Sequence, residues 1–347
     1  MRGSMAATIK DIARETGLGV ATVSSYLNGG HVRPQNKDKI EKAIQELHYE
    51  VNETARQLKT NRTRMIGAII PELNSTFYAA VLSRIEDILR QHGYALLICD
   101  CRSDAVREEE AAEFLLRRRV DGIFDVPVEA SGRHLLPYVK AKKPVVLIDR
   151  QIEEIECDSV CVDNYQAVRS AVQLLTSRGH RNIGLLACPQ SNHAATQRLY
   201  GYRKSLEEAG IEVSEELVYQ GADTIDSGTE GMNILIDRNP EMTAVIAASY
   251  RMSFGAVIAA NERNICVPDQ LSMVGFDNPQ FARAVHPRLT IINQPIRQIG
   301  DKAAEIMIRR LAREEPESKR HIWLPAELLE GRSVRRINSF GKQDEMR

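Results

Sequence analysis

The sequence predicts a small all-α head followed by a larger α/β body that contains parallel sheets. Two observations predict the head: apolar residues recur at helical spacing between residues 8 and 47, and Gly17 interrupts them where a sharp turn is needed. One observation predicts the body: beyond residue 64, short apolar runs alternate with helical stretches. Such alternation is typical of parallel strands that are covered by helices.

The first helix of the head is expected to begin after Thr8. The Thr8 hydroxyl can cap this helix, and Asp11, three residues later, can reach back in a capping box. Three apolar residues then fall on one face, namely Ile9, Ile12 and Ala13. Gly17 follows the helix end, where a left-handed backbone costs glycine less than any other residue.

A second helix is expected to begin near Gly19 or Val20, with Val23 and Leu27 facing the first helix. This arrangement predicts a helix-turn-helix whose second helix enters a DNA major groove, which is about 12 Å wide. The outward face of that helix carries small side chains: Val20, Ala21, Thr22, Ser24 and Ser25.

A third helix is expected after Arg33 and Pro34, because proline is favoured at the first helical position. Its apolar residues fall at offsets 0, 3, 4 and 7, which describe one buried face: Ile40, Ala43, Ile44 and Leu47. The alternatives are another small helical bundle, or a Rossmann turn at Gly17-Leu18-Gly19. A Rossmann turn needs a preceding strand and a third glycine, and the sequence supplies neither.

Charge separates the head from the body. The net charge is −1, but residues 1–64 contain 11 lysines and arginines against 7 aspartates and glutamates, so the head is +4 and the remainder −5. A basic head attracts a phosphate backbone, and an acidic body limits indiscriminate binding to nucleic acid. Each basic residue could also be an ordinary solvated charge, so the phosphate-contact candidates are proposed as a set: Lys10, Arg14, Lys37, Lys39, Arg56, Lys59, Arg62 and Arg64.

Several segments resemble the LacI/GalR family of bacterial transcription regulators, and the resemblance covers nearly the whole chain. In the head they are TIKDIARETG, ATVS with its LNG ending, ELHY, and N-x-x-A-R-x-L at 52–58. In the body they are IGAIIP (66–71), RRVDGIF (118–124), VVLIDR (145–150), GHRNIGLL (179–186), GYRKSLEEAGI (201–211), VPDQLSMVGFDN (267–278) and TIINQP (290–295).

The resemblance implies a hinge helix within residues 51–63, between a head at 6–50 and a body at 64–338. In that family two hinge helices, one per subunit, pair in the minor groove when DNA is bound. A helix of about nine residues, at 52–60, is only marginally stable in water, so it needs a partner to form. The alternative is that the segment is a flexible linker. Ala55 permits close approach of the two helices, and Leu58 is placed as a wedge that unstacks base steps and bends the duplex.

The DNA-binding residues are therefore predicted in three groups. The head supplies Thr8 and the outward face of the second helix, Asn28 follows that helix, and the hinge supplies Ala55, Arg56, Leu58 and Lys59. Three positions depart from the family pattern, since Ser25 stands where a base-reading arginine is common, Gly19 where a capping serine is usual, and Val51 where proline is usual. Serine pairs with several bases, so the base preference stays open.

The body is predicted to bind rather than to catalyse. It contains no P-loop, G-x-G-x-x-G, G-x-S-x-G or H-E-x-x-H motif, so we expect no enzyme activity and no cofactor. The six cysteines are scattered without zinc-site spacing, which favours buried reduced thiols and predicts no metal. No run of 18 apolar residues and no signal peptide is found, which predicts a cytoplasmic location and no membrane.

Nine strands are predicted in the body, near 65–70, 94–99, 120–126, 145–148, 160–162, 183–187, 217–219, 244–248 and 271–276. The resemblance implies a periplasmic-binding-protein-like fold of two Rossmann-like subdomains, with the chain crossing between them near residues 162, 291 and 323. The N-subdomain would comprise about 64–161 and 292–322, and the C-subdomain about 162–291 and 323–338. A ligand cleft is expected at the crossings, outside the carboxyl ends of the strands.

The effector candidates follow those strand ends. Phe77 and Tyr78 could stack on a ring or simply pack. Asp149 and Arg150 end one strand. Arg198 matches the family position that grips polar groups of a ligand, and Asp277 ends the VGFDN strand as an acceptor for a hydroxyl or amine. Arg198 and Asp277 could instead form a salt bridge with each other. Arg251 stands where the family usually has an acidic residue, so either the effector is anionic or Arg251 pairs with a neighbouring carboxylate.

The expected function is that of a DNA-binding regulator, most simply a repressor, whose affinity for a palindromic operator changes when a small molecule such as a sugar or sugar phosphate binds. Paired hinges require a homodimer, and the helix from Phe77 to His92, with Ile85 and Leu89 on one face, could lie in its interface or pack internally. The alternative is a periplasmic-type solute-binding protein without a DNA role, which would need the export signal that is absent.

Overall fold

The computed structural model describes residues 7–27, 30–49, 62–129, 131–152, 154–189, 193–314 and 318–337. The chain divides into two compact units at Thr63 and Arg64. The predicted hinge, with Ala55, Arg56, Leu58 and Lys59, lies outside the described residues, as does Asn28.

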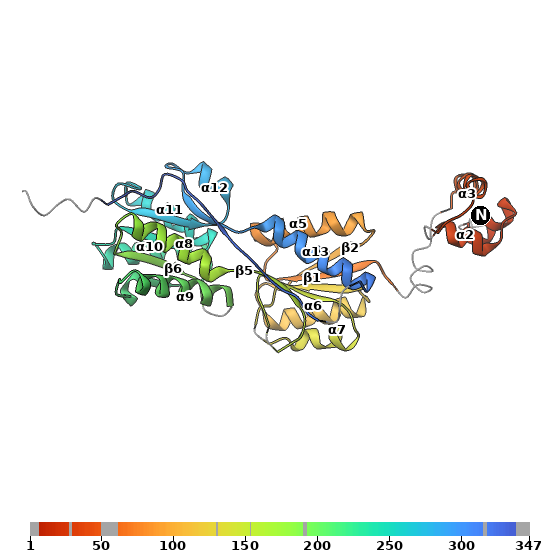
Figure 1. Cartoon of the computed structure of the whole chain (residues 1–347), viewed down its shortest axis with the longest axis horizontal. Helices are drawn as coiled ribbons and strands as arrows, with labels where there is room; N and C mark the ends of the chain where they lie inside the picture. The colour runs from red at the N-terminus through yellow and green to blue at the C-terminus, as the bar shows by residue number, and fades with distance from the viewer. Residues whose placement is uncertain are drawn as a thin grey trace, which may run out of the picture. The chain divides into compact units, whose positions relative to one another are not determined.

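The described residues of the first unit form three helices, α1 (Ile9–Thr16), α2 (Val20–Leu27) and α3 (Pro34–Glu46), labelled in part in Figure 1. Asp11 Oδ2 accepts hydrogen bonds from the backbone nitrogen of Thr8 at 2.9 Å and from its hydroxyl at 2.6 Å. Gly17 ends α1 with a left-handed φ of 67°. The small core lies between the three helices and contains the predicted apolar face: Ile12, Ala13, Val23, Ile40 and Ala43.

The second unit contains two six-stranded sheets. The first sheet is wholly parallel, in the order β11 (His321–Leu324), β5 (Asp158–Val162), β4 (Val145–Ile148), β3 (Gly122–Asp125), β1 (Met65–Ile70) and β2 (Ala95–Asp100). Helices α5 (Thr76–Gln91) and α13 (Ile296–Ala312) pack on one face, and α6 (Ala105–Arg117) and α7 (Leu136–Lys140) on the other (Figure 1).

The second sheet has the order β12 (Glu327–Leu329), β10 (Thr290–Asn293), β9 (Ser272–Phe276), β8 (Ala244–Ala247), β6 (Ile183–Ala187) and β7 (Val218–Gln220). Only β12 is antiparallel to its neighbour. Helices α8 (Asn164–Ser177) and α9 (His193–Glu208) cover one face, and α10 (Ile225–Arg238), α11 (Tyr250–Glu262) and α12 (Pro279–Ala284) the other.

The chain crosses between the two sheets after β5, after β10 and after β11. The last two crossings come slightly later than the sequence suggested, because β10 stays in the second sheet to Asn293 and β11 stays in the first to Leu324. Neither β10 nor β11 nor β12 was among the predicted strands. β11 and β12 are edge strands whose side chains are mostly exposed or half-buried, so they lack the continuous apolar run that marks a buried strand.

The structure shows what covers one face of the helix at 77–92. Ile85 and Leu89 are fully buried in the core beneath α5, where they pack with residues of α13. This face therefore packs internally, and a place for the rest of the helix in the dimer interface stays a prediction. An apolar helix face shows that something covers it, but the sequence pattern is the same whether the cover is another helix or another subunit.

Candidate functional site

The head presents the outward face of α2 to solvent. Val20 is 44% exposed and Ala21 is exposed, while the side chains of Thr22, Ser24 and Ser25 are half-buried. The residue before this helix, Gly19, has no side chain that could cap it. The Gly19 carbonyl accepts hydrogen bonds from the backbone nitrogens of Thr22 and Val23 at 2.9 and 3.2 Å. A face of small side chains on an exposed helix suits close approach to base edges.

The basic residues of the head differ in how they are partnered. Arg14 contacts Asp11 at 3.2 Å, and Lys37 contacts Glu41 at 3.7 Å. These pairs are exposed and therefore weak, so either cation can turn toward a phosphate at little cost. Lys10 and Lys39 are also exposed.

In the body, a cavity of about 720 Å³ lies at the carboxyl ends of the parallel strands, between the two sheets. All of the predicted effector residues line it: Phe77, Tyr78, Asp149, Arg150, Arg198, Arg251 and Asp277. Phe77 packs largely into the core and meets the Tyr78 ring edge to face, with ring centroids 5.3 Å apart. The residues predicted from the strand ends therefore line one cavity. The role of each residue in binding a ligand stays a prediction.

Arg198 is held rigidly on α9. Its Nε donates to Asn164 Oδ1 and its Nη1 to the Ala248 carbonyl, both at 2.7 Å, and the guanidinium lies 3.9 Å from the centroid of the Phe276 ring. No ion pair to Asp277 is formed among the described residues. The alternative of a mutual salt bridge is therefore not what the structure shows, and the fixed guanidinium edge is available to a ligand.

Asp277 lies directly after β9 with a left-handed φ of 55°. Its carboxylate accepts from the backbone nitrogen of Gln294 at 3.1 Å and from its side-chain Nε2 at 2.6 Å. Burial outweighs these contacts and the nearby Arg198, and it raises the pKa of Asp277 to about 6. The ionised carboxylate is therefore poorly solvated, which favours a ligand that donates a hydrogen bond to it.

We expect this carboxyl to make stability depend on pH. Because the folded pKa is above the unfolded one, the stabilising contribution is full below about pH 4 and is lost as the pH rises through about 6, at a cost of roughly 2 to 3 kcal/mol. Chemical denaturation of the wild type and of Asp277→Asn between pH 4 and 7 measures the difference in unfolding free energy. An identical pH dependence in both proteins would show that Asp277 does not contribute.

Asp149 and Arg150 lie at the end of β4, and Asp149 also has a left-handed φ, of 66°. Tyr78 donates its hydroxyl to Asp149 Oδ2 at 3.2 Å, while burial and the nearby carboxylate raise the pKa of that phenol. Arg150 Nη1 donates to the Pro127 carbonyl at 2.6 Å. Three buried polar atoms of cavity-lining residues have no hydrogen-bond partner among the described residues: Asp149 Oδ1, Arg150 Nε and Gln294 Oε1.

Arg251 bridges the cavity from α11 to the loop that follows β1. Its Nη2 lies 2.5 Å from Glu72 Oε2 and 3.2 Å from Asn74 Oδ1, and its Nη1 donates to the Asp223 carbonyl at 3.1 Å. The pairing alternative for Arg251 is the one that the structure supports. This ion pair connects the two halves of the body, because Glu72 follows a strand of the first sheet and Arg251 opens a helix that covers the second.

We expect Glu72 and Arg251 to be energetically coupled. A double-mutant cycle with Glu72→Gln, Arg251→Gln and the double variant should give a coupling energy of about 1 kcal/mol in the unfolding of the body, because the pair is only partly exposed. Strictly additive changes would show that the bridge contributes nothing.

Sequence reasoning missed several cavity residues. Glu72, Asp223, Ser249 and Gln294 all line the cavity, and the Ser249 hydroxyl donates to Asp223 Oδ1 at 2.5 Å. Each follows a strand by one to three residues. Position after a strand could have found Glu72, Asp223 and Ser249, whereas the strand before Gln294, β10, was not predicted. Their partners come from distant parts of the chain and leave no such signal.

Comparisons with known proteins agree with this architecture. Residues 8–52 match the family model "Bacterial regulatory proteins, lacI family", and residues 63–330 match "Periplasmic binding proteins and sugar binding domain of LacI family". Catabolite control protein A of Priestia megaterium is 32% identical over 90% of this chain and 95% of its own length. The transcriptional repressor PurR of Pectobacterium carotovorum subsp. carotovorum is 32% identical over 94% of this chain and 97% of its own.

Solved structures show the same similarity. The regulator CelR in complex with cellobiose is 30% identical, with a TM-score of 0.71 over 94% of this chain and 99% of its own. The lac repressor dimer bound to operator and the anti-inducer ONPF is 25% identical, with a TM-score of 0.81 over 95% of this chain and 100% of its own. No described helix is both long enough and apolar enough to span a membrane. The helix-turn-helix head, the two-sheet body and these matches together show that the chain belongs to the LacI family of bacterial transcription regulators.

Proposed function

We propose that this regulator binds an uncharged, polyhydroxylated molecule, such as a sugar, in the cavity of its body, and that binding changes the affinity of its head for a palindromic operator. The observation that carries the proposal is the mixture of donor and acceptor side chains in the cavity wall. The guanidinium of Arg198 is a donor, and the carboxylates of Asp149, Asp223 and Asp277 are acceptors. Hydroxyl groups both donate and accept, so one polyol can bind to both kinds.

The charges in the cavity support an uncharged ligand over an anionic one. Five carboxylates line it, Glu72, Glu129, Asp149, Asp223 and Asp277, against three guanidinium groups. Arg251 is engaged by Glu72, which leaves Arg150 and Arg198 to face an excess of acid. An anion would therefore meet repulsion that a neutral polyol does not.

The volume of the cavity and the comparisons with the family also support a sugar as the ligand. A cavity of about 720 Å³ is within the range of small-molecule sites, which spans roughly 300 to 1,000 Å³. The family model that covers the body is described by its sugar-binding domain, and CelR was solved with cellobiose.

On the DNA side, we infer that the exposed face of α2 contacts bases and that the segment around Leu58 enters the minor groove, in the cytoplasm where operator DNA lies. The lac repressor was solved as a dimer on its operator. A two-fold operator requires a homodimer here as well.

The dimer interface is proposed on the side of the first sheet that carries β2 and α6. β2 is an edge strand, and its side chains are exposed or half-buried on both faces. Ile98 on β2 and Val106 and Phe114 on α6 are 42%, 66% and 42% exposed. Exposed apolar side chains on an edge strand and its neighbouring helix are a typical subunit contact.

The switch follows from the bridge between Glu72 and Arg251. A ligand that favours the arrangement in which this ion pair is closed shifts the population of body conformations. The ligand then changes the affinity for DNA by a coupling free energy. DNA changes the affinity for the ligand by the same amount.

A thermal-shift screen tests the proposal with separate sets of neutral sugars, sugar phosphates, nucleobases and organic acids. At one hundred times its dissociation constant a true effector stabilises the body by about 2.7 kcal/mol. We expect a neutral sugar to give this shift. A shift produced only by phosphorylated or carboxylated compounds would contradict the uncharged class.

A further inference from the structure

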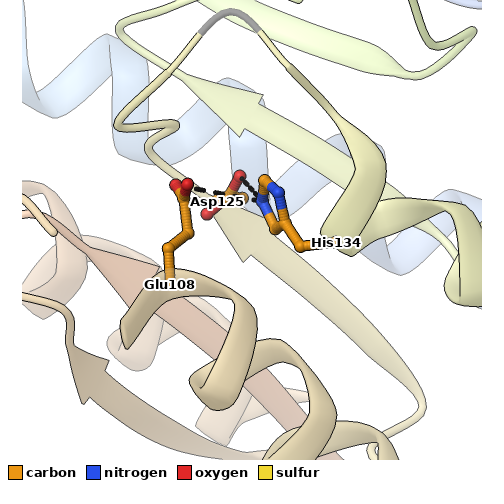
Figure 2. A group of neighbouring side chains, drawn as sticks. All are labelled: Glu108, Asp125 and His134. Atoms are coloured by element: carbon orange, nitrogen blue, oxygen red, sulfur yellow. Dashed lines mark hydrogen bonds and ion pairs between the residues drawn. The ribbon is translucent and has the colours of Figure 1, made fainter. Parts of the chain in front are cut away.

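A second group of polar side chains is buried beside the effector cavity, under the first sheet. Glu108 comes from the first turn of α6, Asp125 from the carboxyl end of β3, and His134 from the 3₁₀ turn at Arg133–Leu135. Figure 2 shows the Asp125 carboxylate lying between the other two side chains. The side chains of all three are at most 5% exposed. None of them lines the effector cavity.

The distances join three potential ligand atoms. His134 Nε2 lies 3.0 Å from Asp125 Oδ2 and 3.8 Å from Glu108 Oε1, and one ligand atom from each residue lies within 4.8 Å of the others. Glu108 Oε1 also accepts from the backbone nitrogen of Val128 at 2.7 Å, which fixes the direction of the carboxylate.

One carboxylate oxygen of the group has no hydrogen-bond partner among the described residues. Asp125 is 0% exposed, and its Oδ1 accepts no hydrogen bond from any described residue. A buried carboxylate oxygen without a partner is costly and is rare in folded proteins. A cation bound by both oxygens of the Asp125 carboxylate would satisfy it.

The charges of the three side chains also suit a cation. Two carboxylates and one imidazole share this buried site. Metal ligation requires ionised carboxylates and a neutral imidazole, and in that form the group carries a charge of −2, which a divalent cation balances.

We propose that Glu108, Asp125 and His134 form a binding site for a first-row divalent transition metal. Zinc-type bonds to nitrogen and oxygen are about 2.0 to 2.2 Å long, so two ligands at 90° to 110° lie about 3.0 to 3.5 Å apart. The separations of 3.0 and 3.8 Å bracket that range. One imidazole nitrogen with two carboxylate oxygens suits Zn²⁺ or Mn²⁺ better than Ca²⁺, which prefers six to eight oxygens.

The site has a structural consequence for the cavity. The backbone of Val128 is bound to Glu108, and Val128 and Glu129 line the cavity wall. A metal that fixes Glu108 therefore also fixes this wall segment, since ligand carboxylates and their hydrogen-bond partners orient one another. Metal occupancy and effector affinity are linked through it.

The alternative is a plain ion pair between His134 and Asp125 with Glu108 beside it. That arrangement explains the 3.0 Å contact and leaves Asp125 Oδ1 without a partner. The two alternatives differ in whether a metal binds, which is directly measurable.

The experiment is calorimetric titration of the chelator-treated full chain with Zn²⁺ and Mn²⁺. We expect one site per chain, and a loss of affinity of at least about 100-fold in His134→Gln and in Glu108→Gln, because even changes outside the ligand set cost about 10- to 100-fold. His92→Gln removes an exposed histidine far from the group in sequence and serves as the control that keeps wild-type affinity. Circular dichroism checks that each variant is folded.

Two further readouts separate this site from others. The absorption spectrum of bound Co²⁺ should lack thiolate charge-transfer bands, which excludes Cys99 and Cys101 as ligands. Hydrogen exchange in the segment 122–135 should slow on metal addition. Absence of binding by both metals, or unchanged stoichiometry and affinity in a folded His134→Gln variant, overturns the proposal.

Discussion

Replacing Arg198 by alanine should lower effector affinity by about 100-fold, the equivalent of about 3 kcal/mol. Hydrogen bonds to a charged group contribute about 1.5 to 3 kcal/mol each, and the guanidinium edge can make two of them to a ligand. The side chain is already fixed by Asn164, Ala248 and the Phe276 ring, so little entropy is lost when a ligand binds. Calorimetric titration with the sugar identified by the screen measures the change.

Arg203→Ala is the matched control for this experiment. Arg203 lies on the same helix, is paired with Glu215 at 2.8 Å, and does not line the cavity. Its removal should leave effector affinity unchanged. Arg198→Lys should fall between wild type and alanine, because an ammonium keeps the charge but not the forked geometry. Equal affinity in Arg198→Ala and Arg203→Ala would show that Arg198 does not bind the effector.

The second large effect is expected in DNA binding. Leu58→Ala should weaken specific operator binding by at least about tenfold while leaving nonspecific binding and its salt dependence nearly intact. Unstacking a base step costs a few kcal/mol, which an inserted leucine offsets and an alanine does not. Fluorescence anisotropy with operator and with scrambled DNA, at several salt concentrations, separates the two kinds of binding.

Lys59→Ala is the contrasting variant, since a phosphate contact should act on both kinds of DNA. Its loss should weaken both and reduce the salt slope by about one. If Leu58→Ala and Lys59→Ala behaved alike, the wedge assignment would be refuted.

The head could be predicted almost completely from the sequence because its information is local. The Thr8 and Asp11 pair, the left-handed Gly17 and the proline at the start of α3 act within four residues, and the structure shows all three. The apolar face was found by spacing alone, since a helix places residues three and four apart on one side.

The body was predicted well in its long elements and less well where function depends on distant partners. Arg251 could be identified as unusual, but its partner Glu72 is 179 residues away and only the fold brings them together. For the same reason the group of Glu108, Asp125 and His134 could not be found from the sequence. Those residues lie on a helix, a strand and a turn, without the regular spacing that zinc motifs have.

Sugar-dependent operator binding is tested by selecting bound sequences from random DNA with the full chain. Anisotropy measurements on the selected site then follow, with and without the sugar found in the screen. We predict a two-fold symmetric site, bound by a dimer, whose affinity changes about 5- to 150-fold when the sugar is added. Enrichment of no symmetric sequence, or an operator affinity that is the same at all sugar concentrations, would contradict it.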